Sequence, residues 1–206
     1  MPVIAVVGNK GGAGKTTLCV NIAAGLSRNA SIAMIDADPQ GSSLQWRAIA
    51  GDNVSFPVYA PTFSLKDQAK KYAANNDYVL IDCPPSVHAQ QTVAVLEFAD
   101  MALVPVQPSP VDIWATVHIE KAINEAREVN PSLKAMLVIN QLESRTTLSR
   151  LVREVLSEIA LPVAETAVRR RAIYRNSALE GKSVYNLGKR GADAAEELDS
   201  LIKEVT

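Results

Sequence analysis

The sequence has few cysteines, no long apolar run and no basic leader, and each shortage excludes a class of protein. Only two of the 206 residues are cysteine, Cys19 and Cys83, which argues against a disulfide framework and suits a reducing compartment. No run of about 18 uncharged apolar residues occurs, so a membrane-spanning helix is excluded. The N-terminus has no basic segment before its apolar residues, unlike a signal peptide. We therefore expect a cytoplasmic protein.

Histidines and linker segments are also scarce. His88 and His118 lie thirty residues apart, and neither has a cysteine or a second histidine at ligand spacing. A zinc site and a Ser/His/Asp hydrolase therefore have no support. The chain has no internal repeat, no low-complexity segment and no linker rich in proline and glycine. Because a domain typically has about 150 residues, we expect one domain over residues 1–206.

Short apolar runs alternate with longer amphipathic segments along the chain. The runs are nearly continuous, as in parallel strands buried on both faces. This alternation predicts an α/β fold, with a doubly wound, mainly parallel sheet and helices on both faces. The expected strands are Val3–Val7, Ala30–Ile35, Val54–Tyr59, Tyr78–Ile81, Met101–Val106, Ala135–Ile139 and Leu161–Val163. The expected helices are Thr17–Arg28, Ser42–Ala50, Leu65–Ala74, Gln90–Phe98, Asp112–Val129, Leu148–Ile159 and Lys189–Glu204. Trp46 and Trp114 are expected to pack helices against the sheet.

A glycine-rich segment joins the first expected strand to the first expected helix. Its end fits the phosphate-binding pattern G-x-x-x-x-G-K-[ST], although Asn9 stands where the first glycine belongs. In this pattern Lys15 contacts the β- and γ-phosphates and the Thr16 hydroxyl ligates Mg²⁺. The residues expected to surround the phosphates are Gly11, Gly12, Ala13, Gly14, Lys15, Thr16 and Thr17. A glycine-rich turn that matches by chance is the alternative, but the position between a strand and a helix favours a phosphate site.

A second lysine, Lys10, precedes Lys15 by five residues and completes the motif Lys-Gly-Gly-x-Gly-Lys-Thr-Thr. Here the sequence resembles the ParA/MinD family of deviant Walker ATPases, in particular its ParA-like partition and positioning members. The resemblance implies a P-loop NTPase fold, ATP as ligand and a homodimer that sandwiches the nucleotides. It also implies that Lys10 reaches the phosphates of the partner, much as an arginine finger does. A solvated loop lysine is the alternative for Lys10.

Carboxylates follow the second expected strand in the segment Asp36-Ala37-Asp38-Pro39-Gln40. The carboxyl ends of parallel strands face the ligand crevice of an open α/β sheet. The segment resembles the switch I motif of the family, which implies that Asp38 orients the attacking water. The resemblance also implies that Asp36 lies near the Mg²⁺ shell and that Gln40 approaches the γ-phosphate or the dimer face. The alternative is that both aspartates only cap the next helix.

Two later strands also end in polar residues. Asp82 follows the apolar run Tyr78–Ile81, a Walker B pattern in which the carboxylate holds Mg²⁺ directly or through water. The full Asp-Cys-Pro-Pro resembles the family's switch II. Asn140 stands where the family reads the adenine ring, and its amide can donate and accept as that ring requires. The alternative for Asn140 is a bond to its own backbone. No guanine-reading N/T-K-x-D motif occurs, so ATP is favoured over GTP.

Positive and negative charges nearly cancel over the chain but are unevenly distributed. Residues 169–190 hold seven basic side chains and one acid, Glu180. Such a concentration predicts nucleic-acid binding, with a solvated face as the alternative. The expected DNA contacts are Arg169, Arg170, Arg171, Arg175, Lys189 and Arg190, with Arg145, Arg150 and Arg153 as further candidates. No sequence-reading motif accompanies them, so we expect non-specific binding that weakens steeply with salt.

The C-terminal segment 191–206 carries five acids against Lys203 and has no aromatic residue. Anionic lipid repels such a helix, so a membrane-associated division-site regulator is disfavoured and packing on the sheet is expected. The sequence thus predicts a Mg²⁺-dependent, nucleoid-associated ATPase. By resemblance, an adaptor protein stimulates hydrolysis, and the cargo is a plasmid, a chromosome region or a carboxysome. The alternatives are a same-fold ATPase of the amidotransferase or metallocluster-maturation type and a non-hydrolysing scaffold.

Overall fold

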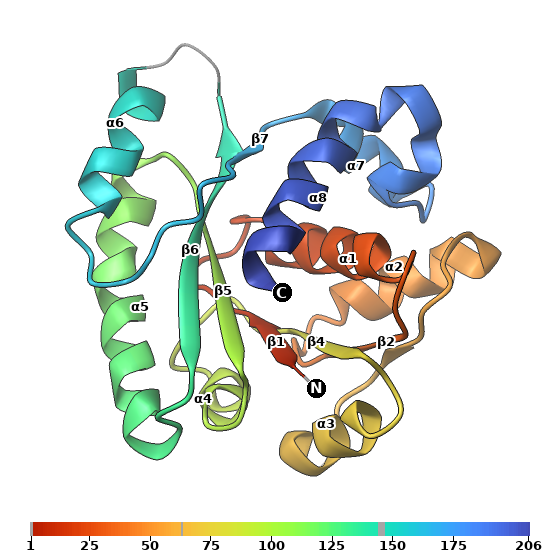
Figure 1. Ribbon diagram of the computed structural model, residues 1–206, viewed down its shortest axis with the longest axis horizontal. Coiled ribbons are helices and arrows are strands. Elements are labelled where there is room, and N and C mark those ends of the chain that lie inside the picture. The colour runs from red at the N-terminus through yellow and green to blue at the C-terminus, as the bar shows by residue number, and fades with distance from the viewer. Residues whose placement is uncertain (1, 63, 144–146) are drawn as a thin grey trace.

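The computed structural model describes residues 2–62, 64–143 and 147–206, and for residues 147–150 only the backbone. Arg145 and the side chain of Arg150, two of the further basic candidates, therefore lie outside the described residues. Within the described chain, seven parallel strands form one sheet in the order β3-β2-β4-β1-β5-β6-β7 (Figure 1). Their bounds are β1 Val3–Val6, β2 Ile32–Asp36, β3 Val58–Tyr59, β4 Tyr78–Asp82, β5 Met101–Val106, β6 Lys134–Leu142 and β7 Val168–Arg169.

Helices cover both faces of the sheet, as the sequence predicts (Figure 1). One face carries α1 (Lys15–Leu26), α2 (Ser42–Ala50), α7 (Ala172–Leu179) and α8 (Ala192–Val205). The other face carries α3 (Leu65–Ala73), α4 (Gln90–Leu96), α5 (Pro110–Val129) and α6 (Thr147–Leu156). Two 3₁₀ helices, η1 (Gly51–Asn53) and η2 (Val184–Arg190), complete the described elements.

Side chains alternate along the strands and so divide the interior into two cores. Ile4 and Val6 of β1 pack with α1 and α8, whereas Ala5 packs with the helices of the opposite face. Both sides of the central strands are therefore apolar, which explains why the strands read as continuous apolar runs. β1 lies between β4 and β5, so the strands on its two sides are reached by connections that run in opposite directions along the sheet. The loop after β1 therefore opens at this switch point, where open α/β sheets bind their ligands.

The C-terminal third differs most from the predicted elements. The expected strand Leu161–Val163 is only an isolated bridge between Val163 and Leu137. The last strand is β7, which ends at the first residue of the basic segment 169–190. Helix α7 was not predicted, and the final helix begins at Ala192 because Gly188, with φ +54°, interrupts the turns before it. The strand expected at 54–59 is reduced to two residues. Such short elements leave too few apolar residues for a periodic pattern.

The two tryptophans have opposite environments. Trp46 is buried and stacks on Phe56, with ring centroids 6.0 Å apart, as expected of a core residue. Trp114 is 70% exposed, so the prediction that it packs against the sheet is wrong. Helix α5 turns Ile113, Thr116 and other buried residues toward the sheet, which leaves Trp114 on the outer side. Helix α8 was expected to pack on the sheet; its buried residues lie in the core on one face of the sheet, where it contacts α1 and β7. No described helix is both long and apolar enough to cross a membrane.

Candidate nucleotide-binding site

The loop between β1 and α1 has a backbone shape that depends on glycine. Gly12 and Gly14 have φ of +82° and +88°, a region in which other residues are strained. A Cβ on Gly14 would lie 2.5 Å from Nδ2 of Asn140. Gly14 is the N-cap of α1, and no described side chain caps this helix. The N–H groups of its first turn are therefore available to a phosphate.

Two lysines of the loop make contacts within the chain. Lys15 is buried, and its Nζ donates to the Lys10 carbonyl oxygen at 3.0 Å. Burial lowers the pKa of Lys15, and the nearby carboxylates Asp82 and Asp38 oppose that effect. The Nζ of Lys10 donates to Oδ2 of Asp112 at 3.1 Å. Asp112 is a buried residue in the first turn of α5 that sequence reasoning missed, since nothing in the motif points to it.

Asp36 and Asp82 end the neighbouring strands β2 and β4 and pair in register. Both side chains are fully buried. Ser43 Oγ donates to Oδ2 of Asp82 at 2.6 Å, whereas Oδ1 of Asp82 is buried without a partner in the described chain. Burial raises the pKa of Asp82 to about 6, and the Ser43 and Thr16 side chains oppose this rise. A buried carboxylate oxygen with no partner fits a cation or a water bound to one.

The 36–40 segment makes hydrogen bonds within itself and to the first turn of α2. Asp36 Oδ2 accepts from the Leu44 N–H at 2.9 Å, and its Oδ1 accepts from the Asp38 N–H at 3.2 Å. Asp36 therefore does support the start of α2, as the capping alternative supposed. Asp38 is partly exposed, and its Oδ1 accepts from the N–H of Gln40, an exposed residue, at 2.9 Å. Capping by Asp36 does not conflict with a place near a metal shell, because a carboxylate has several acceptor positions.

No three described His, Cys, Asp or Glu side chains gather into a ready metal site. Magnesium is usually held by one or two carboxylates together with phosphate oxygens and waters, so an incomplete protein shell is what it requires. The unpaired Oδ1 of Asp82, close to Thr16, fits this chemistry.

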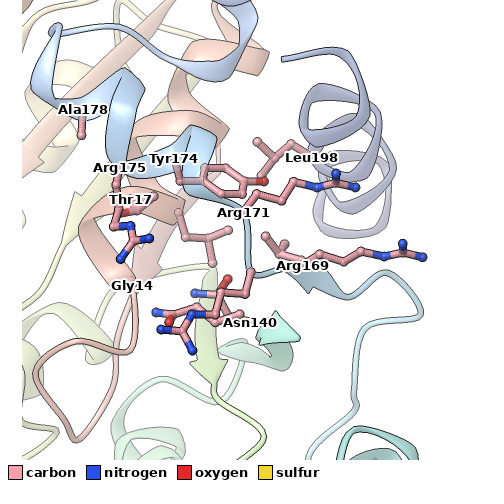
Figure 2. Close-up of a pocket in the computed structure, with 13 residues that line it drawn as sticks. Gly14, Thr17, Asn140, Arg169, Arg171, Tyr174, Arg175, Ala178 and Leu198 are labelled. Carbon is pink, nitrogen blue, oxygen red and sulfur yellow. The ribbon is translucent and has the colours of Figure 1, made fainter. Parts of the chain in front are cut away.

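A cavity of about 220 Å³ opens beside Gly14 and Thr17. Asn140 lies at its wall, 6% exposed, and its Nδ2 donates to the Ala13 carbonyl oxygen at 2.7 Å. Tyr174 of α7 also lines the cavity, and its buried hydroxyl has no partner in the described structure. Figure 2 shows the Tyr174 ring above Asn140, on the far side of the cavity. A pocket with an aromatic ring and an amide beside a phosphate loop has the features of a nucleoside site.

The arginines predicted to bind DNA lie closer to this cavity than expected, since Arg169, Arg170, Arg171 and Arg175 all line it. Figure 2 shows Arg169 and Arg171 extending toward α8, while Arg175 turns toward Gly14. The sequence count also missed the acids that the fold brings to these side chains. Glu197 pairs with Arg169 and Arg171, Asp193 with Arg171, and Glu143 with Arg170. Lys189 and Arg190 are exposed and make no ion pair within the described residues.

These features define a class of protein. The site is a glycine-rich loop with a buried lysine, and it lies between the first strand and the first helix of a parallel sheet, next to an aspartate at a strand end. This arrangement is that of a P-loop nucleotide-binding protein. Residues 4–184 match the CobQ/CobB/MinD/ParA nucleotide binding domain, and the chain belongs to this family. The resemblance inferred from the lysine motif is thus confirmed.

Known proteins that resemble the chain include both positioning proteins and an enzyme. It is 40% identical over 205 residues to "Maintenance of carboxysome distribution protein A" of Halothiobacillus neapolitanus, covering 98% of this chain and 95% of that protein. The ATP complex of a variant McdA from Cyanothece superposes with a TM-score of 0.77 at 18% identity, over 99% and 95% of the two chains. Cobyrinic acid a,c-diamide synthase of Mycobacterium smegmatis, with bound ADP and magnesium, gives 0.76 at 23% identity, over 98% and 94%. The likeness to these two structures shows the fold alone.

Proposed function

We propose that this chain is a Mg²⁺-dependent ATPase that dimerises with ATP, binds DNA without sequence preference and distributes carboxysomes along the nucleoid. One observation carries the proposal: the loop with two lysines lies at the strand ends that present Asp38 and Asp82. The 40% identity to a carboxysome distribution protein, over nearly the whole length of both chains, favours that cargo over a plasmid or a chromosome region. Residues 1–206 act as one ATPase domain in this proposal.

ATP binding begins at the phosphate loop. The N–H groups from Gly11 to Thr17 surround the β-phosphate, and Lys15 exchanges the Lys10 carbonyl oxygen for phosphate oxygens. The carbonyl contact keeps the buried ammonium group of Lys15 hydrogen-bonded until the nucleotide arrives. The adenosine enters the cavity lined by Asn140 and Tyr174. Thr16, Asp36 and Asp82 would hold Mg²⁺, which neutralises phosphate charge when bound.

Dimerisation requires Lys10 to change its partner. In the described chain its ammonium group bonds Asp112 of the same chain, and 47% of the side chain is exposed. In the dimer Lys10 leaves Asp112 and contacts the phosphates of the partner's nucleotide. Because the lysine contributes charge only when two copies meet, hydrolysis depends on dimer formation. Asp38 orients the attacking water and Gln40 adjoins the γ-phosphate, and an adaptor protein accelerates this step.

DNA binding uses the basic side chains of β7, α7 and η2. Lys189 and Arg190 have no acidic partner in the described chain, so their charge is available to DNA phosphates. Arg175 also has no acidic partner there, but it lines the cavity proposed for adenosine. Arg169 and Arg170 are exposed and would exchange their ion pairs for phosphate contacts at little cost. Arg171 pairs with the largely buried Glu197 and with Asp193, so it would contribute less to DNA binding. Two copies joined by ATP present two basic surfaces at once, which raises the affinity for DNA without any new contact.

The alternatives are less well supported. An amidotransferase of the cobyrinic acid synthase type shares the fold, but 23% identity carries no activity over to this chain. A membrane-associated regulator is disfavoured because α8 is acidic and packs on α1 through Leu198 and Leu201. A non-hydrolysing scaffold is disfavoured because the sequence places Asp38 beside a well-matched phosphate loop.

The proposal is tested by mass and DNA binding measured on the same protein. Light scattering should give twice the monomer mass with ATP and the monomer mass with ADP, and random-sequence DNA should bind tightly only in the ATP state. Lys10→Ala should still bind ATP but remain monomeric. Lys121→Ala, which removes an exposed lysine of α5, is the matched control and should behave as the wild type. A wild-type protein that stays monomeric with ATP, or binds DNA equally in both states, would contradict the proposal.

A further inference from the structure

We propose that Gln107 and Gln141 are positioning residues that clamp the phosphate loop in the shape that receives ATP. Both side-chain amides donate to one atom, the Gly12 carbonyl oxygen, at 2.7 Å from Gln107 and 2.9 Å from Gln141. The two glutamines come from neighbouring strands: Gln107 directly follows β5, and Gln141 lies in β6. The inference rests on the ATP binding proposed above and adds to it what holds the loop open. No feature of the phosphate-loop motif points to either glutamine.

The backbone of Gln141 is distorted in a way that this contact explains. Gln141 has φ +56° and is the only described non-glycine residue with positive φ. It occupies a bulge, since Asn140 pairs with Val168 and Leu142 with Arg169. In a regular strand, consecutive side chains point to opposite faces. The bulge instead lets Asn140 and Gln141 both reach the loop, at the carbonyl oxygens of Ala13 and Gly12. Strain of this kind is retained where the surroundings over-determine it, and it gathers at functional sites.

Fixing these carbonyl groups also orients the donors that face a phosphate. In a planar trans peptide the C=O and the next N–H point in opposite directions. When Gln107 and Gln141 hold the Gly12 carbonyl outward, the Ala13 N–H must point the other way. Asn140 does the same through the Ala13 carbonyl for the Gly14 N–H. A carbonyl oxygen has two lone pairs, so both glutamines can bond Gly12 together. The loop thus keeps its phosphate-binding shape before any nucleotide arrives.

Two single variants separate this role from a merely structural one. Gln141→Gly removes one amide that bonds the loop and also relieves the positive-φ strain. ATP affinity and the thermal stability of the nucleotide-free protein should therefore not fall together. We expect a three- to tenfold loss of ATP affinity, of the order of one hydrogen bond. The thermal midpoint of the nucleotide-free protein should stay unchanged or rise, because glycine tolerates this backbone. Gln107→Leu should lower ATP affinity by a similar factor. Gln91→Leu, a half-buried glutamine of α4 with no described side-chain hydrogen bond, is the control and should bind ATP like the wild type.

The double variant tests whether the glutamines act on one atom. The affinity of the nucleotide-free double variant for an ATP analogue is measured by fluorescence titration. The fold-loss of affinity should differ from the product of the fold-losses of the two single variants. Three results would overturn the proposal: wild-type affinity in both single variants, a simple product in the double variant, or a thermal midpoint of Gln141→Gly that falls together with affinity. If the wild type itself binds no ATP, the proposed function fails instead.

Discussion

Replacing Asp112 by asparagine should make the protein dimerise at lower concentration. Asp112 is 5% exposed and accepts from the Lys10 ammonium group at 3.1 Å, so it holds the lysine within its own chain. If Lys10 acts on the partner's nucleotide, this bond must break before the dimer closes. Asparagine keeps the size of the side chain and removes its charge, so Lys10 should leave more easily.

The expected size of the effect follows from the geometry of the pair. Lys10 is half exposed, so water screens the pair, and its contribution is about 1 kcal/mol rather than that of a buried ion pair. Two copies break two such bonds, which amounts to about 2 kcal/mol per dimer. Since 1.4 kcal/mol corresponds to a factor of ten, the dimer dissociation constant should fall about 30-fold.

Sedimentation at graded protein concentrations with ATP measures this constant directly. An Asp38→Ala background, which removes the carboxylate proposed to orient the attacking water, should keep the ATP intact. Ser64→Ala is the matched control, because the Ser64 hydroxyl caps α3 through the Asp67 N–H and contacts neither Lys10 nor Asp112 among the described residues. It should lower the stability of the fold by about 1 kcal/mol and leave the ATP-dependent dimer unchanged. An Asp112→Asn protein that dimerises no better than its parent would refute the idea that this pair restrains Lys10.

The site leads to four further predictions. Lys15→Ala should abolish ATP binding in a fluorescence titration without loss of thermal stability, because a buried ammonium group is removed. Lys189→Ala together with Arg190→Ala should lower the salt slope of DNA binding by about two units. Arg171→Ala should mainly lower the free energy of unfolding by about 1–2 kcal/mol in denaturant unfolding, because Arg171 pairs with two acids of α8. Tyr174→Phe should leave the nucleotide-free protein equally stable or more so, since its buried hydroxyl has no described partner, and should lower ATP affinity about three- to tenfold. Unchanged ATP affinity would place the nucleoside elsewhere.

The phosphate loop and the alternation of strands with helices could be predicted because both depend on local sequence. Glycines with positive φ, a lysine at the start of α1 and an aspartate at the end of an apolar strand are each visible in a short window of residues. The alternation of apolar runs with amphipathic helices fixed the class of fold for the same reason.

What could not be predicted depends on contacts between distant segments. Asp112 is 102 residues from Lys10, and Gln141 is 129 residues from Gly12. The acids Asp193 and Glu197 belong to a helix that appeared separate from the basic segment, yet the fold brings them onto Arg171. A charge count along the sequence therefore overstated the free positive charge. Helix α7 was missed because its buried face is small, with Ser177 its only buried residue.

The central claim is that ATP joins two copies of this chain through Lys10. The most direct measurement is the mass of the Asp38→Ala protein in solution with ATP, compared with the same protein carrying Lys10→Ala. A dimer is expected for the first and a monomer with bound ATP for the second. A dimer in both proteins would contradict it.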